Sequence, residues 1–251
     1  MIVNGYRIPM VASLLVWAVL WEIVGQLQLT ILLPPLSAIV VRLFEIVPTP
    51  SFLSALWVTA YAFFIGNVIA IGVGVPLGIA MGRSVIADRL FLPWVNLFLS
   101  APLTALVPVI MVIFGLGQTT IILTVVLFAI WIIVLDARAG VRSISPSLVE
   151  MARSFGASRF QAFTRIYLWA ALPEILAGIR LGVIRAVKGV IIGQLLVSIV
   201  GFGALFKLYG SRFLMEHFWA ALLVLFALAF ILAESLSWLE RRVDFYAASR
   251  G

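Results

Sequence analysis

Two cationic residues within an apolar stretch are the part of this sequence whose type and spacing most directly suggest chemistry. Arg185 and Lys188 lie in the strongly apolar run 174–200. In a helix, residues three apart share one face. Cations inside a hydrophobic segment are costly, and by default they mark a path or a partner. We expect Arg185 and Lys188, with Gln194 farther along the run, to line a path for a small anion.

Other interpretations of these residues stay open. Arg185 and Lys188 have Glu22 or a neighbouring subunit as alternative partners, or they extend along the helix to reach water. Arg180, in the same run, has Glu234 as a candidate partner. For Gln194, structural hydrogen bonding between helices is the alternative.

Other kinds of chemistry have few side chains to support them. The chain has no Cys and one His, which excludes thiolate catalysis, disulfides and Cys- or His-cluster metal sites. That residue, His217, lies beside Glu216 and near Trp219, a pattern typical of an interfacial anchor. No G-x-x-x-x-G-K-S/T phosphate-binding loop occurs. We therefore expect no enzymatic activity, no metal and no cofactor in this chain.

Composition places these residues in a membrane. Of 251 residues, 64% are hydrophobic and 11% charged, and the mean hydropathy is +1.22. Soluble domains have about 45–50% apolar and about 25% charged residues, so the sequence predicts an all-α polytopic membrane protein. The net charge of +7 fits arginines that fix topology, and no basic tail suggests a nucleic-acid partner.

Stretches nearly free of charge divide the chain into six predicted helical spans. A tight reversal is expected at 115–118, and Pro34-Pro35 ends the first span. A cleaved signal peptide is the alternative for residues 1–25, but no A-x-A-like cleavage site follows it. The spans form one domain, 1–251, and cover about 8–28, 53–82, 91–114, 119–137, 174–200 and 217–239.

The distribution of Lys and Arg orients these spans. With the N-terminus inside, 11 of the 17 cations fall on the cytoplasmic side, three fall outside, and three lie in the fifth span. This asymmetry predicts a multi-pass protein of the cell inner (plasma) membrane with both termini in the cytoplasm.

Glycines recur at spacings of four in two of the spans. The second span carries Gly74, Gly78 and Gly82, and the fifth carries two such pairs, beginning at Gly178 and Gly189. Small residues at this spacing let helices approach closely. We expect them to pack helices within the subunit or across a dimer.

The loop 138–173 is the one long cytoplasmic segment, and its signals predict helix, glycine turn, helix. A capping box at 147–150 starts the first helix, with Ser145-Pro146 as an alternative start. Gly156 suits a left-handed C′ position, and 158–161 is a second capping box. The first helix has an apolar stripe of Leu148, Met151, Ala152 and Phe155.

A bent helix pair of this kind has two possible uses. It is apolar on one side and carries Arg153, Arg159 and Arg165. Such a pair docks in a groove of another protein, or it lies on anionic membrane lipid. Spacing alone favours neither.

Part of this loop resembles the EAA loop of permease subunits of ATP-binding-cassette (ABC) importers, written E-A-A-x3-G-x9-I-x-L-P. Glu150-Met151-Ala152, Gly156 and Ile166-Tyr167-Leu168 match it in order and spacing. A methionine holds the second motif position. Trp169 stands where the proline is usual, which leaves Pro173 as the break before the fifth span.

The resemblance extends over nearly the whole chain, and it points to the nitrate/sulfonate/taurine-like branch of these permeases. It implies the type I ABC importer permease fold, with six transmembrane helices and a coupling loop. The other matching segments are Leu33 to Ser37, Gly74 to Gly78, Ala105 to Pro108, Phe114 to Gly117 and Leu239 to Arg242.

The resemblance also implies partners and a coupling element. In the family the EAA helix sits in a cleft of a cytoplasmic ABC ATPase, which binds ATP and Mg²⁺ on its own chains. We expect an ATPase dimer, a second copy of this chain as a homodimer, and an external solute-binding protein. By resemblance the coupling residues are Glu150, Met151, Ala152, Arg153, Phe155, Gly156, Ala157 and Arg159.

The expected function is that of the permease subunit of an ATP-driven, binding-protein-dependent importer. A cationic path fits a small anion such as a sulfonate, nitrate or carboxylate. The alternatives are a stand-alone secondary carrier or channel, and an ABC importer for a vitamin or pyrimidine precursor. A stand-alone carrier would leave the capped loop without a role.

Overall fold

The computed structural model describes residues 2–3, 6–7, 10–197 and 199–248, and these residues are almost entirely helical. The all-α prediction is confirmed, apart from a two-residue ladder in which β1 (Ile2–Val3) pairs antiparallel with β2 (Tyr6–Arg7). The helices are α1 (Met10–Gln26), α2 (Leu36–Ile46), α3 (Pro50–Arg83), α4 (Val85–Ser100), α5 (Val107–Phe114), α6 (Gln118–Arg142), α7 (Pro146–Ser154), α8 (Arg159–Ala162), α9 (Leu168–Val197), α10 (Gly201–Ser211) and α11 (Met215–Ala248).

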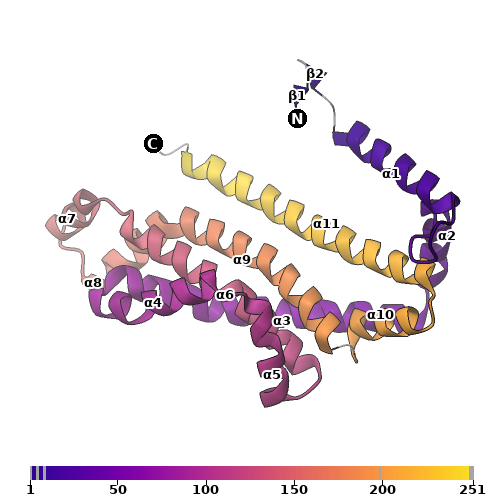
Figure 1. The fold of residues 1–251 in the computed structure, drawn as a ribbon. Coiled ribbons are helices and arrows are strands. Elements are labelled where there is room, and N and C mark those ends of the chain that lie inside the picture. The colour runs from indigo at the N-terminus through magenta and orange to yellow at the C-terminus, as the bar shows by residue number, and fades with distance from the viewer. Residues whose placement is uncertain (1, 4–5, 8–9, 198, 249–251) are drawn as a thin grey trace.

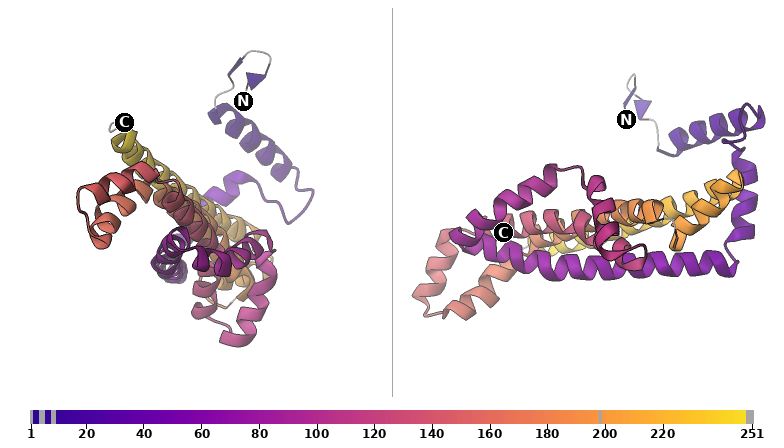
Figure 2. Two further views of the ribbon diagram at one scale, coloured as in Figure 1. Left: turned by 90° about the vertical axis from the view of Figure 1, so that its left-hand side faces the viewer. Right: turned by 60° about the horizontal axis from the view of Figure 1, so that its bottom comes forward.

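Long helices run side by side along the molecule (Figure 1). α6 packs along both α3 and α9, and α11 packs against α9, α10 and α2. At one end α7 and α8 project as a hairpin, and α2 and α10 lie at the opposite end (Figures 1 and 2). We call these the hairpin end and the far end.

Glycines make the central packing of α3, α6 and α9 possible. A Cβ on Gly78 of α3 would lie 2.5 Å from the carbonyl oxygen of Val134 on α6. A Cβ on Gly182 of α9 would lie 2.5 Å from Cγ1 of Ile133, which is also on α6. The predicted use of the glycine spacing is therefore confirmed within the subunit: α6 is held between two glycine-lined helices.

The third predicted span, 91–114, corresponds to two helices and not to one. α4 ends at Ser100, a 3-10 turn follows over Leu103–Leu106, and α5 runs at 101° to α4. Ala101 has an extended backbone (φ −72°, ψ 147°), because a residue before proline, here Pro102, is disfavoured in the α region. The reversal expected at 115–118 lies between α5 and α6.

The fifth predicted span also differs in its limits. α9 already begins at Leu168 and contains Pro173, so this proline does not break the helix. A π turn over Phe163–Tyr167 joins α8 to α9 and takes up the irregularity instead. Beyond Val197 the direction changes by 50° into α10.

Helix length bears on how many of these segments cross a membrane. Among the described residues, α3 and α6 are each long and apolar enough to cross alone. The bent pairs, α4 with α5 and the helix over 160–197 with α10, raise the number to four if each is one span. The apolar parts of α1 and α11 are shorter, so the count of six stays a prediction.

Candidate functional site

The hairpin at 146–167 is built from the local signals that the sequence contains. α7 begins at Pro146, so the chain uses the alternative start, and the N–H of Leu148 donates to the carbonyl of Ser145 (3.1 Å). Gly156 has φ +74°, and the N–H of Ala157 donates to the carbonyl of Ala152 over 2.9 Å. This is the left-handed C-cap expected for a glycine at C′.

The second helix starts in a reciprocal capping box. The N–H of Ser158 donates to Oε1 of Gln161 (2.8 Å), and the N–H of Gln161 donates to Oγ of Ser158 (3.2 Å). Two backbone donors that have no helical partner are thereby satisfied. The angle between α7 and α8 is fixed by this box together with the glycine turn.

The hairpin presents apolar side chains outward. Phe155 is 83% exposed and Phe160 is 73% exposed, and Met151 on α7 is also exposed. Ala152 is buried, Ala157 is half-buried, and Glu150 is exposed. The side chains of Arg153 and Arg159 lie outside the described set. Two exposed phenylalanines on a projecting hairpin form an unpartnered apolar surface.

The hairpin is firmly connected to the long helices. Its second arm continues through the π turn into α9, and the Arg83 guanidinium at the end of α3 lies 5.4 Å from the ring centre of Tyr167. A Cβ on Gly140 of α6 would lie 2.9 Å from the carbonyl oxygen of Ala171 on α9. A displacement of the hairpin must therefore move α9 and the adjacent end of α6.

An ion-pair cluster that the sequence interpretation missed lies at the hairpin end. Asp88, in the first turn of α4, accepts hydrogen bonds from Nε and Nη2 of Arg138 (Nη2 at 3.1 Å) and from Nη2 of Arg142 (2.7 Å). We call these three residues the Asp88 clamp. The Asp88 side chain is 10% exposed and that of Arg138 15%. Asp88 follows the N-cap Ser84, which signals a helix start, but its partners lie 50 and 54 positions away.

The clamp favours the ionised carboxylate. Hydrogen bonds from Arg138 hold the pKa of Asp88 below its ordinary value; burial opposes this, and the charges of Arg138 and Arg142 add to it. Arginine binding a carboxylate through two nitrogens is strong and directional.

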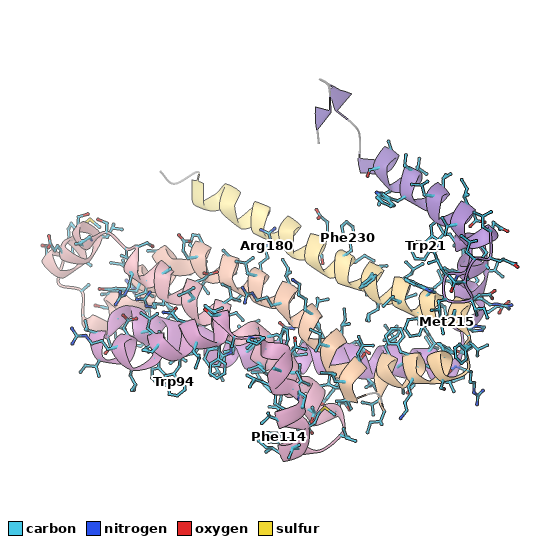
Figure 3. The ribbon with its side chains drawn as sticks, viewed as in Figure 1. Trp21, Trp94, Phe114, Arg180, Met215 and Phe230 are labelled. Carbon is cyan, nitrogen blue, oxygen red and sulfur yellow. The ribbon has the colours of Figure 1, made fainter. Side chains whose placement is uncertain are left out.

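The candidate path residues differ in their exposure and their neighbours within a single chain. Arg185 is half-buried and interacts electrostatically with Asp136 of α6, whereas Lys188 is exposed. Gln194 is 1% exposed and donates from Nε2 to Oγ1 of Thr59 over 2.6 Å. Arg180, labelled in Figure 3, lies earlier in α9 than these three residues. The path role of these residues stays a prediction.

Glu22, a candidate partner of those cations, instead has neighbours near the far end. It accepts hydrogen bonds from the N–H and hydroxyl of Ser37 (2.9 and 2.7 Å) and from Gln26 (2.8 Å). Ser37 lies in the first turn of α2, so the carboxylate caps that helix and faces its positive end.

The far end carries a second polar cluster. Arg42 Nε donates to Glu216 over 2.7 Å, and Nη1 donates to Glu45 over 2.7 Å. These carboxylates raise the pKa of Arg42. A cavity of about 280 Å³ lies here, and its lining includes Arg42, Glu216 and His217. Trp219 Nε1 donates to the Leu32 carbonyl (2.8 Å).

Several large apolar side chains point away from the helices. Trp94 on α4 and Phe114 on α5 do so in Figure 3, and they are 56% and 55% exposed. Val112 on α5 is 87% exposed. Apolar surface on this scale is the outside of a protein that faces lipid or further subunits.

These features define a helical membrane protein with a projecting hairpin. Residues 74–245 match the family described as the binding-protein-dependent transport system inner membrane component. The chain belongs to this family, and it is a transmembrane permease of a binding-protein-dependent transport system. Family membership favours this function over a stand-alone carrier or channel.

Three named relatives are similar over different lengths. The taurine transport system permease protein TauC of Escherichia coli (strain K12) is 30% identical over 240 residues, which cover 93% of this chain and 87% of that protein. SsuC of Bacillus subtilis (strain 168), named as an aliphatic sulfonates transport permease, is 27% identical and covers 73% and 67%. The riboflavin transport system permease protein RibX of Chloroflexus aurantiacus is 31% identical but covers 59% and 55%.

A solved structure is similar in fold. A chain of the inward-facing MetNI methionine ABC transporter has a TM-score of 0.57 and 24% identity, and the match covers 77% of this chain and 94% of that one. The type I importer permease fold is therefore confirmed.

Proposed function

We propose that the chain is the membrane subunit of an ATP-driven importer for a small organic anion of the sulfonate class. The hairpin carries the ATP-driven part of the proposal, because it exposes Phe155 and Phe160 beyond the ends of α3 and α6 and continues into α9. Apolar anchors on a bent helix pair suit a groove in another protein. The partner is a dimer of cytoplasmic ABC ATPases that binds ATP and Mg²⁺ on its own chains.

The hairpin end then lies in the cytoplasm. With six spans, both termini lie there too, in the inner (plasma) membrane. This orientation agrees with the positions of the arginines, because Arg83, Arg89, Arg138 and Arg142 all lie at the hairpin end and positive loops stay inside.

A second copy of the chain completes the path. Lys188 is exposed on the single chain, as are Val112 and Ile113 of α5, so one copy leaves both charge and apolar surface uncovered. A homodimer supplies the missing wall, and surrounding lipid covers the rest. The far end, with its cavity beside Arg42 and Glu216, faces an external solute-binding protein.

The sulfonate class rests on two observations. Two relatives that match over 93% and 73% of this chain are named for taurine and aliphatic sulfonates, and Arg185 and Lys188 place positive charge along α9. A vitamin is the second candidate, favoured by the similarity to the riboflavin permease over a shorter length.

Reconstitution tests the proposal. The chain, with the ATPase and binding protein that accompany it, is placed in proteoliposomes, and uptake of radiolabelled taurine is measured with and without ATP, with riboflavin in parallel. We expect ATP-dependent taurine uptake. Uptake that does not depend on ATP, or a purified chain that recruits no ATPase, would contradict the proposal of an ATP-driven importer. Riboflavin uptake without taurine uptake would contradict the sulfonate class and favour a vitamin as the substrate.

Two exposed side chains give a matched pair for the docking role. Phe155→Ala should weaken recruitment of the ATPase by about 10-fold or more, because burial of a phenylalanine contributes about 1.5–3 kcal/mol. Phe44→Ala, also an exposed phenylalanine (75%) but on α2 at the far end, should leave recruitment unchanged. Gly156→Pro should abolish recruitment, because proline cannot adopt φ +74°. Equal recruitment by all three variants would remove the hairpin from the interface.

A further inference from the structure

The Asp88 clamp joins α4 to the part of α6 that leads into the hairpin. Arg138 and Arg142 occupy the last turn and a half of α6, and Arg142 is its final residue, four positions before α7 begins. Both arginines meet on the one carboxylate of α4. The clamp therefore connects α4 to the end of α6 that precedes the hairpin. It is remote from the far end and is separate from the candidate path residues.

Close packing makes this end of α6 a rigid support. A Cβ on Gly82 of α3 would lie 2.6 Å from Cβ of Val141, and the corresponding atom on Gly78 would lie 3.1 Å from the N atom of Arg138. Gly140 contacts α9 in the same way. Helices packed this closely move together, because the glycine side of the contact leaves no gap into which the other helix could shift.

α4 is the element that responds to this support. Beyond Asp88 it packs on α6 through the buried Val95 and through Phe98, whose ring stacks on Trp131 with centres 4.2 Å apart. It then ends at the Ala101-Pro102 break, and α5 turns away at 101° toward α6 and α9. A movement of α4 therefore changes the position of α5.

We propose that Asp88 is a positioning residue for transport, which transmits the displacement of the hairpin through Arg138 and Arg142 to α4 and α5. This inference rests on the proposed function, because it requires an ATPase that moves the hairpin. A charge-paired contact suits the role: it is directional, and its loss leaves two arginines without their carboxylate while the apolar contacts of α4 remain.

Spin labels test the transmission without the need for a known solute. The chain has no cysteine, so Leu90→Cys on α4 and Leu208→Cys on α10, both exposed, give one labelled pair in each copy, and an excess of unlabelled chain keeps labels of two copies out of the same homodimer. The labelled chain is assembled with its ATPase, and the distance between the labels is measured by pulsed electron paramagnetic resonance before and after trapping with ATP and vanadate. We expect a shift of about 2 Å or more in the parent.

Asp88→Asn should remove most of this shift, while ATP hydrolysis and recruitment of the ATPase stay at the parent level. Taurine uptake, where the parent shows it, should fall by about 2- to 30-fold. Asp88→Glu, which keeps the carboxylate, should restore part of the shift. Arg89→Gln removes a charge from the adjacent, exposed position of α4 and should behave as the parent.

The outcomes separate this inference from the proposed function. A parent chain that recruits no ATPase contradicts the proposed function. A parent that recruits the ATPase but shows no shift, or an Asp88→Asn variant with the full shift, overturns the inference alone. A parallel loss of shift, ATP hydrolysis and recruitment of the ATPase in Asp88→Asn would also overturn it, because the clamp would then only hold the fold together.

Discussion

Gln194 on α9 donates a hydrogen bond to Thr59 on α3 over 2.6 Å, and both side chains are buried. The Thr59 hydroxyl in turn donates a hydrogen bond to the carbonyl of Ala55 (2.7 Å). Among the described residues, Oε1 of Gln194 has no partner. The pair lies directly beneath Gly201, the first residue of α10, which has φ +62°. A polar contact between two helices thus sits where the chain turns from α9 into α10.

Gly201→Ala is expected to destabilise the protein. A Cβ at this position would overlap Nε2 of Gln194, and the left-handed backbone is unfavourable for alanine. We expect a loss of about 1–3 kcal/mol, seen as a lower Tm in detergent. Gly210→Ala, in the same helix, has no atom within 4 Å of its Cβ and should not lower the Tm. Equal Tm values for the two variants would show that the turn is not constrained.

A double mutant separates the two causes. Gln194→Ala removes the overlapping amide but not the backbone strain, so Gly201→Ala should cost less in that background than in the parent. The difference is the coupling between the two positions. If Gly201→Ala costs the same in both backgrounds, the contact with Gln194 contributes nothing.

Gly78→Ala is expected to weaken the packing of α3 on α6. Its Cβ would lie 2.5 Å from the carbonyl oxygen of Val134, and backbone cannot move aside as a flexible side chain can. Overpacking of this kind costs about 1–3 kcal/mol. The matched control is Gly72→Ala on the same helix, where no atom lies within 4 Å. Unfolding in mixed micelles should separate the two variants, and equal stability would contradict the close approach.

Local signals allowed much of the hairpin to be predicted from the sequence, because its elements depend on neighbouring residues. The capping box at 158–161 and the left-handed Gly156 are both present. The Asp88 clamp escaped prediction because its partners are remote in sequence. Likewise, the 101° bend after α4 depends on Pro102 and on the packing of α5, whereas the apolar run alone suggested a continuous helix.

The candidate path was less accessible to sequence reasoning for a related reason. Polarity within a span identified Gln194, but it did not show which way the side chain points. The structure places it against Thr59 inside one chain. Glu22, similarly, caps α2 through Ser37. None of the hydrogen bonds described for Glu22 comes from a cation of α9.

The Asp88 clamp should respond to pH in one direction. Its folded-state pKa is lowered, chiefly by the hydrogen bonds from Arg138, so its contribution to stability is present above the unfolded value of about 3.9 and is lost as the pH falls through the folded value. The Tm difference between the parent and Asp88→Asn should therefore be constant from about pH 8 to pH 5 and shrink below about pH 4. A difference that grows on acidification would contradict the ionised clamp.

Lys188→Met and Arg185→Met are expected to affect uptake in different ways. Lys188 is exposed on the single chain, so its loss should lower taurine uptake without lowering the Tm, because only the charge presented to the path changes. Arg185 interacts electrostatically with Asp136, so its loss also removes an opposite charge from the neighbourhood of a carboxylate and should lower the Tm as well as uptake. Uptake is measured in proteoliposomes at matched protein levels, with ATP hydrolysis as the control for assembly. Unchanged uptake of the anion by both variants would show that Arg185 and Lys188 do not line the path. Contacts between subunits would then be the role of these charges.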